Sequence, residues 1–333
     1  MLRKNVLSIY LIFSSLSVIL MVLFPTGGNG IGSLAAYAQE ENSHVSRIFI
    51  PLLIVGASED LSPQPDYPTL EDWLTYLNSY RLMANLPVVT NNESWNQGTW
   101  YHSRYMVKNN ILTHYEEPTN PYFTYEGDQA GRSGNLVGSF NNEANDRYAI
   151  DIWMQAPFHA VSILDPSLLS VGYGSYREIG SGLQMGATLD VLRGREMIPE
   201  EVEFPIMWPA DGKTVNINHH WGEYPSPLTS CPGYQAPTGL AVILQLGSGD
   251  QIPQVSAHSF FVGDSALEHC IFDETSYINP NSADQILGRA ILSARSAIVL
   301  IPREPLQPGE NYTVSITTND QTYTWSFYVG FGR

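Results

Sequence analysis

The pattern of hydrophobic residues changes near residue 195, and this change constrains the fold more than any other feature of the chain. Before residue 195, apolar residues recur at helical spacing between glycine-rich segments. After it, short β-rich runs alternate with turn residues, and helical periodicity fades. A chain of 333 residues is long enough for two domains. We therefore predict an α+β domain followed by an all-β domain, with a charged linker over 194–203.

Three helices and two strands are predicted in the first domain. A capping-box pattern at 69–72 precedes the first helix, and the second covers about 94–110. The third begins at Asn145 or Asp146 and is stopped by Pro157, which cannot continue a helix. Strands are expected over 168–177 and 182–192. Helices that precede paired strands indicate an α+β fold, in the form of a three-layer αβα sandwich.

The second domain is expected to be an all-β sandwich of immunoglobulin-like type over 204–333. Turn residues such as Asn319 and Asp320 separate its apolar runs, and the residues on either side of this turn alternate as in an antiparallel hairpin. The predicted strands cover 240–245, 259–262, 267–272, 297–301, 312–317 and 322–329.

The N-terminus has the layout of a secretory signal peptide over 1–38. Two basic residues precede an apolar run over 6–24, and Ala36-Tyr37-Ala38 provides the small residues of a cleavage site. Residues 39–68 are interpreted as a linker because prolines and polar residues dominate its second half. The prediction is a secreted protein. The alternative is an uncleaved membrane anchor that faces the outside, since the apolar run is long enough to cross a bilayer.

Cysteine and charge content support an extracellular protein. The chain has two cysteines, Cys231 and Cys270, and an even pair in a secreted chain favours a disulfide. Acidic residues outnumber basic ones 33 to 16, which gives a net charge of −17 without any basic run. A nucleic-acid partner requires a positive surface, so this class of function is excluded.

Four short motifs carry a resemblance to a known family. They are LNSYR at 77–81, YHSRYM at 101–106, WMQAPFH at 153–159 and VGYG at 171–174. In this order and spacing, the region over about 69–193 resembles the CAP superfamily, also called the SCP-like extracellular domain. The resemblance implies an αβα sandwich with a surface cleft that holds two histidines and two acidic residues.

The histidines of that cleft correspond to His114 and His159, and two converging imidazoles can hold zinc or another divalent metal. The two acidic residues are missing: Gly134 and Ala156 stand where the family has carboxylates. The residues assigned to the cleft are His114, His159, Asn135, Tyr115 and Trp153.

The loss of both carboxylates weakens the case for catalysis. A catalytic zinc site uses three protein ligands, so Glu116, Glu126 or Asp128 would have to complete the set. His102 is expected to pack inside its helix, and His219 and His220 are not expected to coordinate one ion together. We therefore assign no cofactor, with zinc or another divalent metal as the alternative. We favour a protein that is not an enzyme.

The segment between His114 and Asn135 is rich in aromatic residues, including Tyr115, Tyr122 and Tyr125. We expect an ordered loop whose rings cover the core. The alternative is an aromatic-walled groove for an apolar or carbohydrate ligand. The association of the CAP family with sterol and lipid binding makes a lipid ligand admissible by resemblance.

Three functions follow from these observations. The favoured one is a secreted, non-catalytic binding or interaction protein whose cleft around His114 and His159 takes a lipid, peptide or glycan. The first alternative is a divalent-metal-dependent hydrolase or peptidase that uses the same two histidines. The second is an adhesion protein that works through the β-sandwich.

Overall fold

The computed structural model describes residues 11–14, 17–20, 58–60 and 71–331. The chain divides into two compact units, Met1–Arg47 and Ile48–Arg333. In the first, β1 (Leu11–Ser14) pairs antiparallel with β2 (Ser17–Leu20). The remainder of the predicted signal peptide and most of the predicted linker over 39–68 lie outside the described residues. No described helix combines the length and apolar character that a membrane span requires.

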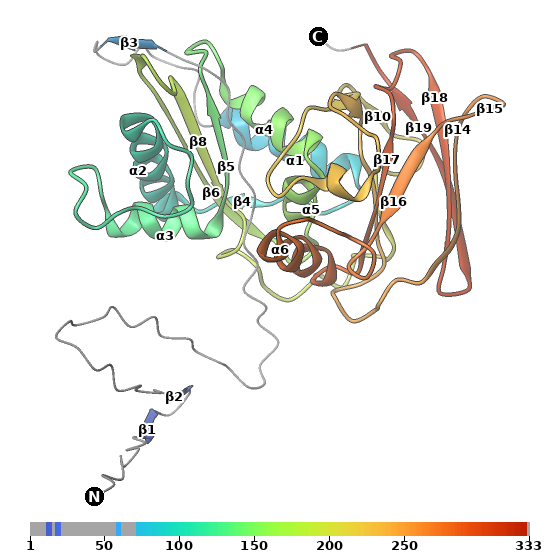
Figure 1. The fold of residues 1–333 in the computed structure, drawn as a ribbon, viewed down its shortest axis with the longest axis horizontal. Helices are drawn as coiled ribbons and strands as arrows, with labels where there is room; N and C mark the ends of the chain where they lie inside the picture. The colour runs from blue at the N-terminus through green and yellow to red at the C-terminus, as the bar shows by residue number, and fades with distance from the viewer. Residues whose placement is uncertain (1–10, 15–16, 21–57, 61–70, 332–333) are drawn as a thin grey trace, which may run out of the picture. The chain divides into compact units, whose positions relative to one another are not determined.

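A three-layer arrangement forms the N-terminal part of the second unit, which we call the layered part (71–193). Helices cover both faces of its four-stranded sheet, as Figure 1 shows, and the predicted αβα sandwich is confirmed. The sheet runs in the order β4 (Thr90–Asn91), β6 (Ser170–Arg177), β8 (Met185–Asp190), β5 (Gly134–Ser139). On one face lie α2 (Glu93–Asn109) and α3 (Tyr125–Ser133); on the other lie α1 (Glu71–Met83), α4 (Asp146–Gln155) and α5 (Pro157–Ile163). A separate small pair joins β3 (Ser58–Asp60) to β7 (Ile179–Gly180).

Local sequence signals account for the ends of these helices. The Asn145 side chain accepts a hydrogen bond from the backbone N–H of Tyr148 and so caps α4. Pro157 then opens α5, where its missing N–H costs nothing. Helix α3 is new, because 114–135 is expected to be a loop; the Thr124 side chain caps it by accepting from the N–H of Gly127.

The C-terminal part (204–331) contains two larger sheets and one α-helix. All six predicted strands are found, and β18 (Asn311–Thr318) and β19 (Gln321–Val329) form the predicted hairpin. Its turn residues Asn319 and Asp320 have φ of 50° and 61°, the left-handed region that asparagine and aspartate tolerate. The helix, α6 (Ser282–Ser293), is not predicted from the sequence. The immunoglobulin-like topology stays a prediction.

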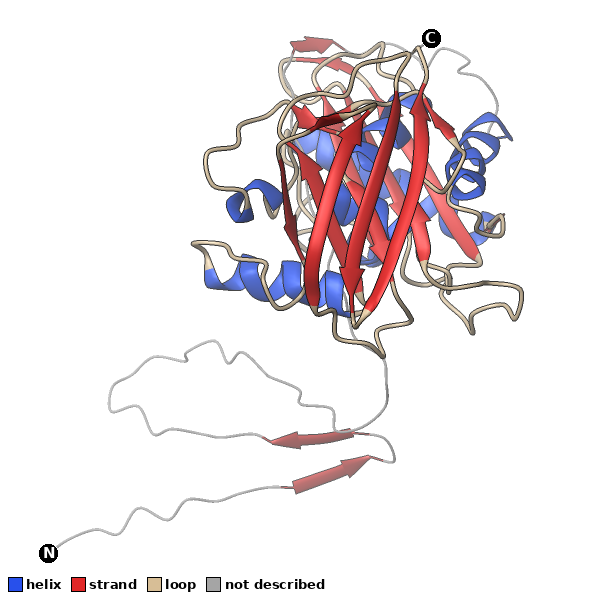
Figure 2. Ribbon diagram, turned by 90° about the vertical axis from the view of Figure 1, so that its right-hand side faces the viewer, coloured by secondary structure: helices blue, strands red, loops and turns tan. Residues whose placement is uncertain are grey.

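The remaining strands are arranged as follows. The four-stranded sheet runs β16 (His269–Phe272), β17 (Ala297–Pro302), β13 (Val242–Gln245), β9 (Ile206–Trp208). The five-stranded sheet, whose strands cross the front of Figure 2, runs β10 (Thr214–Val215), β19, β18, β14 (Val255–Val262), β15 (Ser265–Ala266). Two short strands, β11 (His219–His220) and β12 (Thr238–Gly239), pair with each other, and η1 (Pro227–Ser230) is a 3₁₀ helix.

Burial along the strands explains their sequence patterns. Every residue of β17 is buried, because this sheet lies between a helical layer and the five-stranded sheet (Figure 1). Its sequence is accordingly a continuous apolar run. By contrast, β18 alternates buried and more exposed residues, since one of its faces meets solvent.

The two parts share one hydrophobic core, which runs from Trp73 to Val329. The ring of Phe158 on α5 lies 6.3 Å from that of Phe272 and 5.2 Å from that of Tyr277, both in the C-terminal part. A second contact joins Tyr80 and Trp208 at 5.7 Å between ring centroids. The domain boundaries at 69–193, 194–203 and 204–333 stay predictions.

Replacing Phe158 by alanine is expected to lower the free energy of unfolding by about 3–5 kcal/mol, because it opens a cavity at this junction. Denaturant titration measures the change. Tyr125→Ala is the matched control, since its ring is 71% exposed, and we expect a change of at most about 0.5 kcal/mol. Equal effects of the two substitutions would contradict this packing.

Candidate functional site

The side chains of the LNSYR motif at 77–81 hold neighbouring backbone in place. The Asn78 side chain donates to the carbonyl of Val89 (3.0 Å) and accepts from its N–H (2.8 Å). The fully buried Arg81 guanidinium donates to the carbonyls of Pro87, Ile163, Asp165 and Leu168 at 2.6–3.1 Å. Burial lowers the pKa of Arg81 to about 10, and the nearby Asp165 partly opposes this. Both side chains therefore have a structural role.

His159 is buried against a carboxylate that comes from the C-terminal part. Its Nδ1 lies 2.9 Å from Oε2 of Glu223, and the two residues are 1% and 7% exposed. Glu223 also accepts the N–H of Phe158 at 3.0 Å and that of His159 at 3.2 Å. The N-cap residue of α5 is Ala156, whose side chain cannot accept a hydrogen bond from the N–H groups of the first turn. Glu223 therefore caps α5 and neutralises its partly positive N-terminus.

Two further residues of the predicted cleft are buried beside His159. The Asn135 side chain donates to the His159 carbonyl at 3.2 Å and accepts from the Ser162 hydroxyl at 3.0 Å. Trp153 is fully buried, with its ring 6.4 Å from that of Tyr173. Asn135, Trp153 and His159 thus contribute to the core and its polar contacts.

The other two predicted cleft residues lie nearer the surface. His114 is half-buried, and its Nδ1 lies 2.7 Å from the carbonyl of Gly131 on α3. Tyr115 is 46% exposed, and the Arg132 guanidinium lies 4.4 Å from its ring centroid. This geometry brings His114 and Tyr115 against α3.

The three carboxylates considered as a third metal ligand have other surroundings. Glu116 lies 3.0 Å from Nδ1 of His102 and accepts the N–H of Thr124. Asp128 pairs with Arg132 at 2.6 Å, and Glu126 is exposed. Among the described residues, no group of three or more His, Cys, Asp and Glu side chains is placed to hold a metal ion.

His102 is fully buried, as its helical stripe predicts, and both of its ring nitrogens face acceptors. Nδ1 faces the Glu116 carboxylate, and Nε2 lies 2.7 Å from the carbonyl of Thr113. The Thr113 carbonyl can only accept, so Nε2 of His102 donates to it. A Cβ added at Gly131 would lie 2.2 Å from the His102 ring, so glycine is required there for α3 to approach α2.

A buried ion pair joins the layered part to the C-terminal part a second time. Asp165 lies 2.9 Å from Arg295 and 3.0 Å from Arg195. Burial alone would raise the pKa of Asp165, but the two guanidinium groups outweigh it and hold the pKa below its ordinary value. The sequence gives no signal for this pair, because Asp165 and Arg295 are far apart along the chain.

His220 is fully buried beside this junction. Its Nδ1 donates to the carbonyl of Gln155 at 3.0 Å, and its Nε2 has no hydrogen-bond partner among the described residues. Burial lowers the pKa of His220, although the Glu223 carboxylate opposes the effect. The histidine is thus held neutral.

A cluster of half-exposed rings and cations covers the opposite side of the layered part. Arg104 lies 5.9 Å from the ring centroid of Trp100 and 5.0 Å from that of Tyr122. Lys108 lies 5.8 Å from Tyr122 and 2.5 Å from the Glu178 carboxylate. We call the set the α2 aromatic surface: Trp100, Tyr101, Arg104, Lys108, Tyr122 and Tyr176.

Comparison with known families gives a match over residues 74–181 to CAP, the cysteine-rich secretory protein family. The matched range contains His114, Asn135 and His159, together with the α2 aromatic surface. No curated protein and no solved structure matches the chain. The family resemblance predicted from the motifs is confirmed for this range.

Replacing Glu223 by glutamine is expected to destabilise the protein by about 1–3 kcal/mol, because the neutral amide leaves one of the buried N–H groups of α5 unsatisfied. Denaturant titration would show this as a lower transition midpoint. Glu143→Gln, at an exposed position, should leave the midpoint unchanged. A Glu223→Gln protein as stable as the wild type would argue against the cap.

The lowered pKa of His220 predicts a loss of stability in acid. Above its ordinary pKa of 6.5, His220 is neutral in both states and contributes nothing. Below that value the unfolded chain takes up a proton that the folded chain resists, so the free energy of unfolding falls as the pH drops, by at most about 1.4 kcal/mol per pH unit. His220→Gln should therefore lose less stability than the wild type between about pH 7.5 and about pH 5.5. Parallel pH profiles would contradict the prediction.

Proposed function

We propose that this chain, which contains a CAP domain, is a secreted, non-catalytic protein that binds carbohydrate at the α2 aromatic surface. The observation that carries the proposal is the cluster of four half-exposed rings around Arg104 and Lys108. Aromatic rings offer rigid apolar faces for the C–H faces of sugars, and polar groups at their edges can orient a ligand.

Arg104 distinguishes this surface from a set of rings that merely cover the core. Its guanidinium makes no hydrogen bond or ion pair among the described residues, whereas Lys108 is paired with Glu178. A half-exposed guanidinium between two rings has its donors free for hydroxyl, carboxylate or sulfate groups. The chain has 33 acidic and only 16 basic residues, so a cation without an acidic partner sets this surface apart.

Burial of His159 favours a binding function over hydrolysis at the CAP cleft. A general base must contact the reacting group, yet the side chains of His159 and Glu223 are 1% and 0% exposed. The family's two acidic positions are occupied by Gly134 and Ala156.

Secretion is supported by the signal-like N-terminus and by the disulfide. The structure links Cys231 to Cys270, as the sequence predicts. Structural disulfides persist in oxidising compartments such as the extracellular space. The signal segment itself is described only at 11–14 and 17–20.

Binding of the purified chain to immobilised polysaccharides, neutral and acidic, tests the proposal. Trp100→Ala is expected to weaken binding about tenfold or more, through loss of stacking worth about 1.4 kcal/mol. Trp221→Ala is the matched control, because that tryptophan is 57% exposed but lies in the C-terminal part. We expect its affinity to equal that of the wild type.

Three results would overturn the proposal. They are the absence of binding to every polysaccharide, equal losses with Trp100→Ala and Trp221→Ala, and turnover of peptide or ester substrates that His114→Ala abolishes. Recovery of a lipid from the purified protein would also contradict the proposal, because the ligand would then be a lipid. A loss of binding confined to Trp221→Ala would contradict it as well, because the site would then lie in the C-terminal part.

A further inference from the structure

Two histidines meet at the rim between the two sheets of the C-terminal part. His258 lies on β14 of the five-stranded sheet, and His269 lies on β16 of the four-stranded sheet. Nδ1 of His258 is 2.8 Å from Nε2 of His269, and the ring planes are inclined by 79°. His258 is exposed and His269 is half-buried, so solvent reaches the pair.

Hydrogen bonding fixes the orientation of the inner imidazole. Nδ1 of His269 lies 2.7 Å from the carbonyl of Leu267, and a carbonyl only accepts, so this nitrogen carries the proton. In the neutral ring, Nε2 then has its lone pair directed toward His258. A histidine whose second nitrogen donates to a backbone carbonyl, while the first presents a lone pair, is oriented as metal-ligating histidines are.

We propose that His258 and His269 form a binding site for a divalent transition metal that prefers imidazole, such as Cu²⁺ or Zn²⁺. The ion binds Nδ1 of His258 in place of its proton, and a proton is carried by Nε2 instead, so that His258 changes tautomer and stays neutral. With metal–nitrogen bonds of about 2.0–2.1 Å, the two nitrogens stand about 2.9 Å apart at an angle of about 90° on the metal and about 3.3 Å apart at the tetrahedral angle. Binding therefore needs a small separation of the two rings and a rotation that turns both lone pairs toward the ion. The remaining coordination positions are filled by water, since the described residues place no third His, Cys, Asp or Glu there.

This site is separate from the CAP cleft and from the α2 aromatic surface, because both its ligands lie in the C-terminal part. Imidazole ligands suit copper, nickel and zinc, and Cu²⁺ binds most tightly to a given nitrogen site. Unlike His114 and His159, the residues His258 and His269 have ring nitrogens in direct contact, and solvent reaches them.

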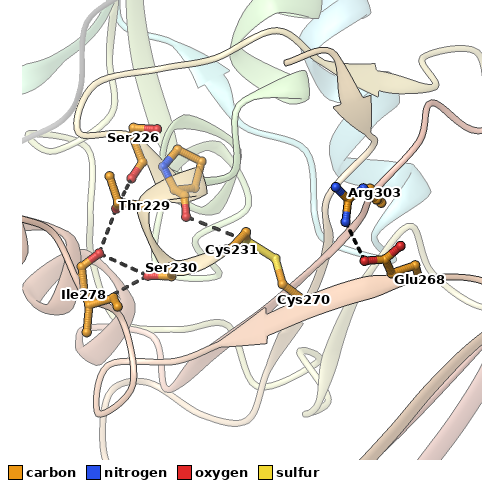
Figure 3. Close-up of a disulfide and its surroundings, with 9 residues drawn as sticks. Ser226, Thr229, Ser230, Cys231, Glu268, Cys270, Ile278 and Arg303 are labelled. Atoms are coloured by element: carbon orange, nitrogen blue, oxygen red, sulfur yellow. Dashed lines mark hydrogen bonds and ion pairs between the residues drawn. A yellow bond between two sulfur atoms is a disulfide. The ribbon is translucent and has the colours of Figure 1, made fainter. Parts of the chain in front are cut away.

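A metal at this position would join the two sheets. Strand β16 is already anchored, because Cys270 follows His269 and is linked to Cys231 (Figure 3). Glu268, on the other side of His269, pairs with Arg303 at 2.6 Å (Figure 3). The ion would fasten β14 to this anchored strand, so binding is expected to stabilise the folded chain by mass action.

The site is tested by titrating the untagged full chain with CuCl₂. Calorimetry measures the binding, and electron paramagnetic resonance identifies the copper ligands. The wild type is expected to bind one Cu²⁺ at this pair, with hyperfine structure from two imidazole nitrogens. His258→Gln and His269→Gln are each expected to weaken that binding by about tenfold or more and to abolish the two-nitrogen signal. His219→Gln, at another half-buried histidine in the C-terminal part, is the matched control and should retain both.

Thermal denaturation provides a second readout. Added ZnCl₂ should raise the Tm of the wild type and of His219→Gln, but not of His269→Gln. Unchanged copper stoichiometry and signal in both pair variants would overturn the proposal, as would equal losses in the control. Polysaccharide binding does not enter either measurement, so failure here is distinct from failure of the proposed function.

Discussion

The Glu223 carboxylate at the N-terminus of α5 is the interaction on which the rest of the structure depends. It accepts two backbone N–H groups of the helix and pairs with the His159 imidazole at 2.9 Å. Replacing this carboxylate by an amide leaves a buried N–H group of α5 without its acceptor, which costs about 1–3 kcal/mol. All seven residues of α5 are buried, so this helix is held by the layered part and the C-terminal part together.

This junction surrounds His159 with structural contacts. The carboxylate that contacts His159 comes from Glu223, which lies outside the matched range of 74–181. Asp165 with Arg295, and His220 with the Gln155 carbonyl, add polar contacts across the same junction. The α2 and α3 face of the layered part lies on the opposite side of its sheet from this junction (Figure 1).

Much of the fold could be predicted from local patterns, and the misses have physical causes. Asn145 and Pro157 mark helix ends by their own chemistry, and the β18–β19 hairpin follows from alternation around Asn319-Asp320. Helix α3 was not predicted because its glycines, Gly127 and Gly131, favour loops, and it is held by packing on α2. The roles of Glu223 and Arg295 could not be predicted, since each is set by a partner distant in sequence.

Amide hydrogen exchange at Phe158 and His159 tests the central claim, that α5 is a junction sealed by the C-terminal part. Both N–H groups are bonded to Glu223 inside the shared core, so they should exchange only through global unfolding. Their protection should then equal the free energy of unfolding from denaturant titration. Faster exchange through local opening, comparable to that of α3 on the surface, would contradict the account.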